Sequence, residues 1–89
     1  MTKVIRFSAA WCGPCKMLAP TFEQLEKEFG DVEFETIDID GNRDTVVEYD
    51  IKTVPTVIFE QNGVVVDKLV GLHSKDEYLN KIYMYNPST

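Results

Sequence analysis

Hydrophobic residues follow two different spacings along the chain, and each spacing predicts one type of secondary structure. Short runs rich in β-branched and aromatic residues are typical of strands, whereas apolar residues three or four positions apart indicate one face of a helix. Strand-like runs cover 4–8, 32–39, 56–60 and 64–70, and helical spacing covers 12–29, 43–49 and the residues after 74. The predicted order is therefore strand, helix, strand, helix, strand, strand, helix.

Glycine, proline and capping residues place the ends of these elements. Gly30 is the expected cap of the first helix, and Asn62-Gly63 predicts a tight hairpin turn between the last two strands. The sequence at 74–77 has the form of a capping box, which begins the last helix, and we expect a frayed tail over 85–89. Two right-handed crossovers and a hairpin then give an α/β fold with a four-stranded mixed sheet and helices on both faces.

Length and composition indicate one small globular domain over residues 1–89, because 44% hydrophobic and 11% aromatic residues supply a single modest core. The formal net charge of −6 argues against a nucleic-acid-binding surface and against attraction to acidic membranes. No apolar segment of the sequence is long enough for a signal peptide or a membrane span. We therefore expect a cytoplasmic protein that is a monomer.

The candidate chemistry lies in the stretch Trp-Cys-Gly-Pro-Cys-Lys at 11–16, which holds both cysteines of the chain, two residues apart. Such a pair can cycle between a dithiol and a disulfide, and the first sulfur should be the attacking thiolate. Cys12 lies where the first helix begins, and the unpaired backbone N–H groups there favour an anion. Pro14 fits the first helical turn, and Cys15, one turn on, would resolve a mixed disulfide.

Two other uses of the cysteine pair are disfavoured. A tetrahedral zinc site needs four ligands, and the only histidine is the distant His73, so no metal is expected. A purely structural disulfide would remove little chain entropy, because the loop that it closes is short. A redox-active Cys12–Cys15 disulfide with no bound cofactor is the preferred interpretation.

The full string at 11–16 after an apolar strand, together with the order of the elements, resembles the thioredoxin family over nearly the whole chain. Pro20 matches that family's helix-kinking proline, Pro55 matches its proline after a cis peptide bond, and Gly71 matches the glycine beside its substrate groove. The resemblance implies a sheet with its strands in the order second, first, third, fourth, and a redox loop at the C-terminal end of the first strand. The family's usual extra N-terminal strand and helix have no counterpart, so we expect a minimal version of the fold.

The resemblance also implies roles for single residues. Cys12 would be the exposed nucleophile and Cys15 the buried resolving thiol. Trp11 would flank the groove, Val54 would pair through its backbone with an extended target, and Gly71 would let the target backbone approach closely. The alternative interpretations are an ordinary core position for Trp11 and a simple strand end at Gly71. The implied site residues are Trp11, Cys12, Gly13, Pro14, Cys15, Lys16, Val54, Pro55 and Gly71.

Two positions depart from the family's pattern. Arg6 stands where the family places a buried aspartate that helps to deprotonate the resolving cysteine, and Thr36 replaces the paired lysine. One hypothesis is that Arg6 lowers the thiol pKa by its charge, with Asp38 as a partner because it shares a strand face with Thr36. The other hypothesis is that Arg6 extends to the surface and has no redox role.

The expected function is that of a protein-disulfide oxidoreductase, which reduces disulfide-containing target proteins by thiol–disulfide exchange. A thioredoxin-reductase-type enzyme would then regenerate the dithiol. One alternative is a glutaredoxin-like protein recycled by glutathione, although the Gly-Pro core of the motif and the single Gly71 argue against it. A second alternative is a binding module that holds a partner in the groove around Pro55, with incidental redox activity.

Overall fold

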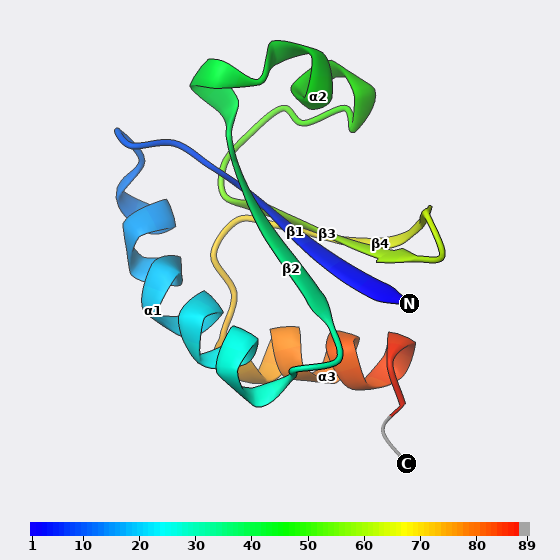
Figure 1. The fold of residues 1–89 in the computed structure, drawn as a ribbon. Coiled ribbons are helices and arrows are strands. Elements are labelled where there is room, and N and C mark those ends of the chain that lie inside the picture. The colour runs from blue at the N-terminus through cyan, green and yellow to red at the C-terminus, as the bar shows by residue number, and fades with distance from the viewer. Residues whose placement is uncertain (88–89) are drawn as a thin grey trace.

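Four strands form one mixed sheet in the computed structural model, which describes residues 1–87 (Figure 1). The strand order is β2-β1-β3-β4, as the resemblance implied. β1 (Thr2–Ser8) runs parallel to β2 (Glu33–Asp38) and antiparallel to β3 (Thr56–Gln61), and β4 (Val64–Val70) pairs antiparallel with β3. Because β1 and β2 are parallel, the loops that follow them lie at the same edge of the sheet.

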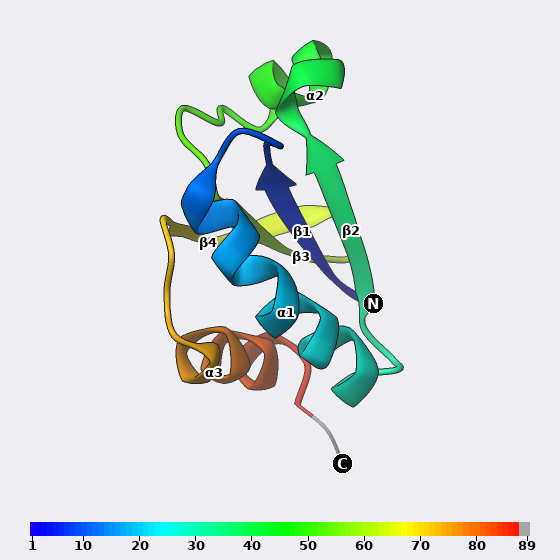
Figure 2. The ribbon, with the colours of Figure 1, turned by 90° about the vertical axis from the view of Figure 1, so that its left-hand side faces the viewer.

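Helices cover both faces of this sheet. α1 (Gly13–Glu28) and α3 (Lys75–Tyr85) lie on one face (Figures 1 and 2). α2 (Arg43–Glu48) lies on the other face, after a short 3₁₀ turn, η1 (Ile39–Gly41). The predicted fold class is therefore confirmed. None of the helices in the described part of the chain is long and apolar enough to cross a membrane.

Alternation along β1 divides its side chains between two cores. Val4 belongs to the core beneath α1 and α3, whereas Ile5 and Phe7 belong to the core beneath α2. Because successive side chains of a strand point to opposite faces, Arg6 and Ser8 face α1 together with Val4. A charged side chain thus lies on a face of the sheet that is otherwise largely apolar.

The C-terminal end of α1 differs from the prediction. The helix begins directly after Cys12, its N-cap, and its C-cap is Phe29, whose N–H donates to the Leu25 carbonyl at 3.0 Å. The prediction of Gly30 as the cap is therefore wrong. Phe29 is buried in the core, and this anchoring ends the helix without a glycine in the left-handed region.

Two local sequence signals act as predicted. Asn62 and Gly63 both have a positive φ, of 52° and 84°, which a tight two-residue hairpin turn requires. Ser74 is the N-cap of α3, and its hydroxyl accepts the N–H of Glu77 at 3.3 Å. The predicted hairpin and the predicted start of the last helix are both confirmed.

The end of α3 is held against the sheet. Tyr85 is the last residue of the helix, its hydroxyl donates to the Asp67 carboxylate at 2.8 Å, and its ring centre lies 6.4 Å from that of Phe59. The prediction of a frayed tail over 85–89 is therefore wrong at Tyr85, because tertiary contacts fix this residue. Residues 88–89, the end of that tail, lie outside the described part of the chain.

Tyr49 connects α2 to the sheet and gives a prediction about pH. It is the C-cap of α2, its ring centre lies 5.5 Å from that of Phe7, and its hydroxyl donates to the Glu60 carboxylate. This hydrogen bond raises the pKa of Tyr49 to about 12. The folded pKa thus lies above the unfolded value of about 10, so the stabilisation is complete below pH 10 and is lost between about pH 10 and pH 12.

An ultraviolet titration of phenolate absorbance would test this shift. We expect the Tyr49→Phe substitution to remove a tyrosine signal that appears only near pH 12. Glu60→Gln is the matched variant, because it keeps Tyr49 but removes the carboxylate, and it should return the signal toward about pH 10. A Tyr49 signal near pH 10 in the unmodified protein would contradict the prediction.

Candidate active site

The loop after β1 places both cysteines at the start of α1. Cys12 is the N-cap and Cys15 lies in the first turn, with their Cα atoms 5.2 Å apart and a disulfide between their sulfurs. Gly13 and Pro14 fill the intervening positions, where no intrahelical hydrogen bond is lost. The backbone N–H of Cys15 donates to Cys12 Sγ at 3.2 Å. The helix N-terminus therefore faces this sulfur, which favours its thiolate form when the pair is reduced.

Both cysteines are buried in the disulfide form. Cys12 is 5% exposed and Cys15 is 2% exposed, so the prediction of an exposed Cys12 is wrong for this state. Cys12 packs with Ala9 and Val54, and its sulfur lies 3.7 Å from the Val54 carbonyl oxygen. The chain just before Pro55 thus covers the disulfide.

The segments around Pro55 and Gly71 contact each other, and Val54, which precedes Pro55, lies against the disulfide. The Val54–Pro55 peptide bond is cis, as the resemblance implied, and Pro55 is buried. The Pro55 carbonyl accepts the N–H of Gly71 at 2.8 Å. Gly71 directly follows β4, and its φ of 85° lies in the region that favours glycine. The fold therefore brings two of the expected groove residues together, although they are far apart in the sequence.

Trp11 lies at the surface of the same region, with 66% of the residue exposed. Its indole N–H donates to Asp40 Oδ2 at 2.9 Å, which ties the loop after β1 to the turn after β2. The interpretation of Trp11 as an ordinary core residue is therefore wrong. The cavity that Trp11 helps to form has a volume of about 220 Å³ and is also lined by Ile39, Val46, Ile51, Lys52, Thr53 and Val54.

Arg6 is half-buried between β1 and α1. Its Nε and Nη2 atoms donate to Thr36 Oγ1 at 3.2 and 3.1 Å, and its guanidinium carbon lies 4.7 Å from the centre of the Phe22 ring. Thr36 is the residue opposite Arg6 in the parallel pairing of β1 and β2. The prediction of Asp38 as the partner is wrong, because its carboxylate accepts the backbone N–H of Asp40 instead. Burial lowers the pKa of Arg6, yet a guanidinium stays charged at neutral pH.

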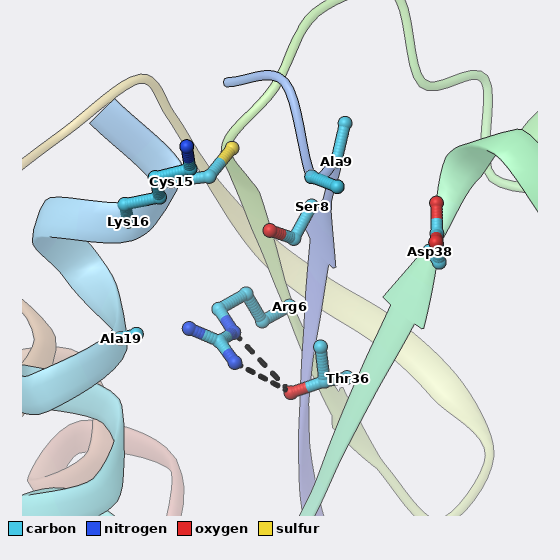
Figure 3. A pocket seen from close by; sticks show the side chains of 9 residues that line it. Arg6, Ser8, Ala9, Cys15, Lys16, Ala19, Thr36 and Asp38 are labelled. Atoms are coloured by element: carbon cyan, nitrogen blue, oxygen red, sulfur yellow. Dashed lines mark hydrogen bonds between the residues drawn. The ribbon is translucent and has the colours of Figure 1, made fainter. Parts of the chain in front are cut away.

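A cavity of about 400 Å³ lies between β1, β2 and α1, and we call it the rear cavity (Figure 3). Arg6 and Cys15 both line it, and so does Lys16, the last residue of the redox motif. The side chain of Arg6 therefore shares a space with the resolving cysteine. This placement disfavours the hypothesis that Arg6 is directed only to solvent.

Within residues 1–87, no group of three or more histidine, cysteine, aspartate or glutamate side chains is placed to hold a metal ion. His73 contacts the carboxylate of Glu77, and its Nε2 lies 2.8 Å from the Val70 carbonyl oxygen. The two sulfurs of Cys12 and Cys15, joined in a disulfide, are redox-active groups of this site.

Comparison with known proteins agrees with this geometry. The family model described as Thioredoxin matches residues 1–84. The chain belongs to the thioredoxin family. It is 40% identical to Thioredoxin H5 of Oryza sativa subsp. japonica over 96% of this chain and 67% of that protein. It is 43% identical to the thioredoxin of Mycoplasmoides gallisepticum over 83% of this chain and 74% of that protein. It is 45% identical to the mitochondrial thioredoxin of Mus musculus over 83% of this chain and 45% of that protein.

Solved thioredoxin structures have the same fold. A mutant thioredoxin from Halobacterium salinarum NRC-1 aligns with a TM-score of 0.93 at 33% identity, over 99% of this chain and 77% of that one. The thioredoxin of Fasciola hepatica aligns with a TM-score of 0.90 at 34% identity, over 96% of this chain and 81% of that one. The chain spans from about half to about three quarters of the length of the three curated thioredoxins. Membership of this family and the bonded cysteine pair together support thiol–disulfide oxidoreductase chemistry at the site.

Sequence reasoning missed three residues of the site. Asp40 binds the indole of Trp11 from 29 positions away, and this contact depends on the parallel pairing of β1 and β2. Phe22 is a buried core residue of α1, and its ring also lies beneath the guanidinium of Arg6. Ser8 lines the rear cavity, and alternation along the strand could have found it, since it lies two residues after Arg6.

Proposed function

We propose that the protein is a cytoplasmic protein-disulfide reductase that works as a monomer and transfers electrons through Cys12 and Cys15. The observation that carries this proposal is the contact of 3.2 Å between the Cys15 N–H and Cys12 Sγ at a helix N-terminus, because it favours an attacking thiolate. A reducing cytoplasm keeps such a pair available as a dithiol.

The proposed reaction has two exchange steps. In the reduced protein, the Cys12 thiolate attacks one sulfur of a target disulfide, and the other target sulfur leaves as a thiolate that takes a proton from solvent. Cys15 then attacks Cys12 Sγ, which releases the first target sulfur and forms the Cys12–Cys15 bond. One cycle thus transfers two electrons to the target.

An extended segment of the target would bind along Val54, Pro55 and Gly71. The backbone of Val54 would pair with it in the manner of an added strand. At Gly71, an added methyl group would meet no atom of the described residues within 4 Å apart from its chain neighbours, so the surface there is open to an approaching backbone. Val54 contacts Cys12, whose sulfur lies 3.7 Å from the Val54 carbonyl oxygen, and Gly71 is joined to the neighbouring Pro55 by a hydrogen bond of 2.8 Å.

We expect a thioredoxin-reductase-type enzyme to return the disulfide to the dithiol. Gly13 and Pro14 between the cysteines, and the single glycine at position 71, favour this donor over glutathione. Insulin reduction driven by NADPH and a thioredoxin reductase, compared with glutathione and its own reductase, would separate the two donors. Faster turnover with glutathione would support the glutaredoxin-like alternative instead.

The reduction potential of the Cys12–Cys15 couple tests the direction of electron flow. We expect equilibration with glutathione redox buffers to give about −270 mV, the value known for thioredoxin itself. A protein that reduces other disulfides needs a reduction potential as low as this. A potential near about −120 mV, as in strong disulfide-forming oxidants, would contradict the proposed reductase function.

A further inference from the structure

The rear cavity gives the buried resolving cysteine a contact with open space. Cys15 is only 2% exposed, yet it lines this cavity of about 400 Å³. Small side chains at Ser8, Ala10 and Ala19 are part of the same lining, and they leave the space open. A volume of this size has room for several water molecules. Figure 3 shows the Ser8 hydroxyl and the Arg6 guanidinium pointing into the gap between β1 and α1, below Cys15.

Both positive and negative side chains line the rear cavity, and the most buried charged group among them is the guanidinium of Arg6. Arg6 comes from β1 and Lys16 from α1, whereas Asp38 on β2 is the one acidic residue in the described lining. Asp38 is exposed, and its carboxylate accepts the Asp40 N–H at 2.9 Å, so it is not held as a base against the sulfur. The rear cavity therefore offers Cys15 a fixed cation but no buried carboxylate.

Two further acidic residues act on the same cation. Glu23 and Glu26 of α1 raise the pKa of Arg6 and thereby oppose the lowering caused by burial. Both carboxylates are exposed, so water and salt screen their effect on the cavity, whereas the half-buried guanidinium is screened less. The two hydrogen bonds to Thr36 Oγ1 and the contact with the Phe22 ring hold that guanidinium in one place.

We propose that Cys15 gives its proton to water that enters the rear cavity, and that Arg6 acts as a positioning residue whose charge favours the remaining thiolate. This inference rests on the proposed function and concerns the step that releases the target. No buried carboxylate is present in the described lining of the rear cavity. Water and the fixed charge of Arg6 therefore take the place of a carboxylate in the deprotonation of Cys15. Arg6 itself exchanges no proton, because a guanidinium is not a base at neutral pH.

The step balances without any further reactant. In the mixed disulfide, the Cys15 thiol transfers its proton to a water molecule in the rear cavity, and the proton passes to bulk solvent. The Cys15 thiolate then attacks Cys12 Sγ, the bond between Cys12 and the target sulfur breaks, and the target leaves as a thiolate that is protonated by solvent. The target sulfur is reduced, and the cysteine pair is oxidised to the disulfide.

The first test measures the pKa of Cys15 by the pH dependence of its alkylation, in a Cys12→Ser background. Arg6→Met should raise this pKa by about one unit, the lower end of the range for the loss of a nearby opposite charge. Arg6→Lys keeps the charge but loses the pair of hydrogen bonds to Thr36. In this variant the pKa of Cys15 should return most of the way to its value in the unmodified protein. Lys27→Met is the matched control, because it removes one positive charge from an exposed position near the far end of α1.

The comparison is decisive because a purely structural role of Arg6 would lower stability without moving the pKa of Cys15. Equal pKa values in Arg6→Met and Lys27→Met would overturn the proposal, as would a lower pKa in Arg6→Met. If Arg6→Met does not fold, the pKa of Cys15 is compared between Arg6→Lys and Arg6→Gln instead. The Arg6→Gln variant, which lacks the charge, must then have the higher Cys15 pKa.

The second test blocks the route for water. An aromatic disulfide that releases a coloured thiolate reports the attack of Cys12 as a first phase and the attack of Cys15 as a second phase. Ala19→Leu should fill part of the rear cavity and slow the second phase several-fold, with the first phase unchanged. Ala19→Met fills the same space with a more flexible side chain and should act in the same direction. An unchanged second phase in both folded variants would overturn the proposal.

These readouts are independent of any biological target. If the unmodified protein fails to reduce insulin, the proposed function fails, whereas the pKa of Cys15 and the two-phase kinetics still decide the role of Arg6 and of the rear cavity. The pH profile adds a further check. Arg6→Met should slow the second phase up to about tenfold at neutral pH, and the two rates should become equal above the raised pKa that Cys15 has in this variant.

Discussion

Replacing Cys12 with serine should reduce the rate of disulfide reduction to that of the buffer thiol alone. Cys12 is the sulfur that faces the backbone N–H of Cys15 at the helix N-terminus, and a serine hydroxyl cannot form a disulfide with a target. Replacing Cys15 with serine should have a different result, because Cys12 can still attack. That variant should accumulate a mixed disulfide that it cannot release.

Insulin precipitation gives the rates, and mass spectrometry of the acid-quenched protein gives the trapped species. We expect the adduct with one insulin chain in Cys15→Ser and no adduct in Cys12→Ser. The two variants are matched controls, since both replace a buried sulfur by oxygen and differ only in position. Trapping at Cys15 in the Cys12→Ser variant would reverse the assigned roles. Full retention of partner binding in both variants would instead support the groove-binding alternative.

Much of the fold was predictable because its signals are local. The hairpin turn needs two residues that accept a positive φ, and Asn62 and Gly63 supply them with no help from the rest of the chain. The start of α3 depends on the hydroxyl of Ser74 and the N–H of Glu77, which lie within one turn of each other. Hydrophobic spacing then fixes the order of the elements, and the crossover rule limits how they can join.

The wrong predictions share a different cause, because each depends on packing between distant segments. Phe29 replaces Gly30 as the cap of α1 since its ring is anchored in the core. Tyr85 stays ordered because of Asp67 on β4, which no spacing in α3 reveals. The burial of Cys12 likewise requires the chain around Val54, 42 positions later.

The partner of Arg6 is a clear example of this limit. Alternation predicts which face of β1 the side chain occupies, and the family resemblance implies Thr36 at the paired position, but the register of β1 against β2 decides that Thr36, and not Asp38, lies opposite. The open space beside Arg6 also depends on small residues from two separate elements, Ser8 on β1 and Ala19 on α1. A sequence pattern therefore identifies the unusual arginine, whereas the cavity that it shares with Cys15 needs the assembled fold.

Tyr78 joins α3 to the loop that contains Gly71, so substitutions of this residue should affect both the stability of the fold and the binding of a target. Its side chain is fully buried in the core beneath α1 and α3. Its hydroxyl accepts the His73 N–H at 3.3 Å and lies 3.4 Å from the Gly71 carbonyl oxygen, to which it donates. Burial raises the pKa of this hydroxyl, so it remains a neutral donor at physiological pH. The aromatic ring therefore supports the core, and the hydroxyl supports the loop at the groove.

Tyr78→Ala should lower the free energy of unfolding by about 3–5 kcal/mol, because it leaves a cavity where a large ring was buried. This loss approaches the whole stability of a small domain, which is about 5–15 kcal/mol. Tyr78→Phe keeps the ring and should cost only about 0.5–1.5 kcal/mol for its two long hydrogen bonds. Urea denaturation measures both changes, and Tyr83→Phe at an exposed position is the control, with an expected change within about 0.5 kcal/mol.

The two Tyr78 variants also separate support of the core from support of the groove. In Tyr78→Phe the Gly71 carbonyl and the His73 N–H lose their common partner, whereas the cysteine pair and the helix that carries it are untouched. We therefore expect the KM for a disulfide-containing protein to rise while the pKa of Cys12 stays the same. An altered pKa of Cys12 with an unchanged KM would contradict this division. It would mean that the core beneath α1, and not the loop at Gly71, transmits the effect of Tyr78 to the site.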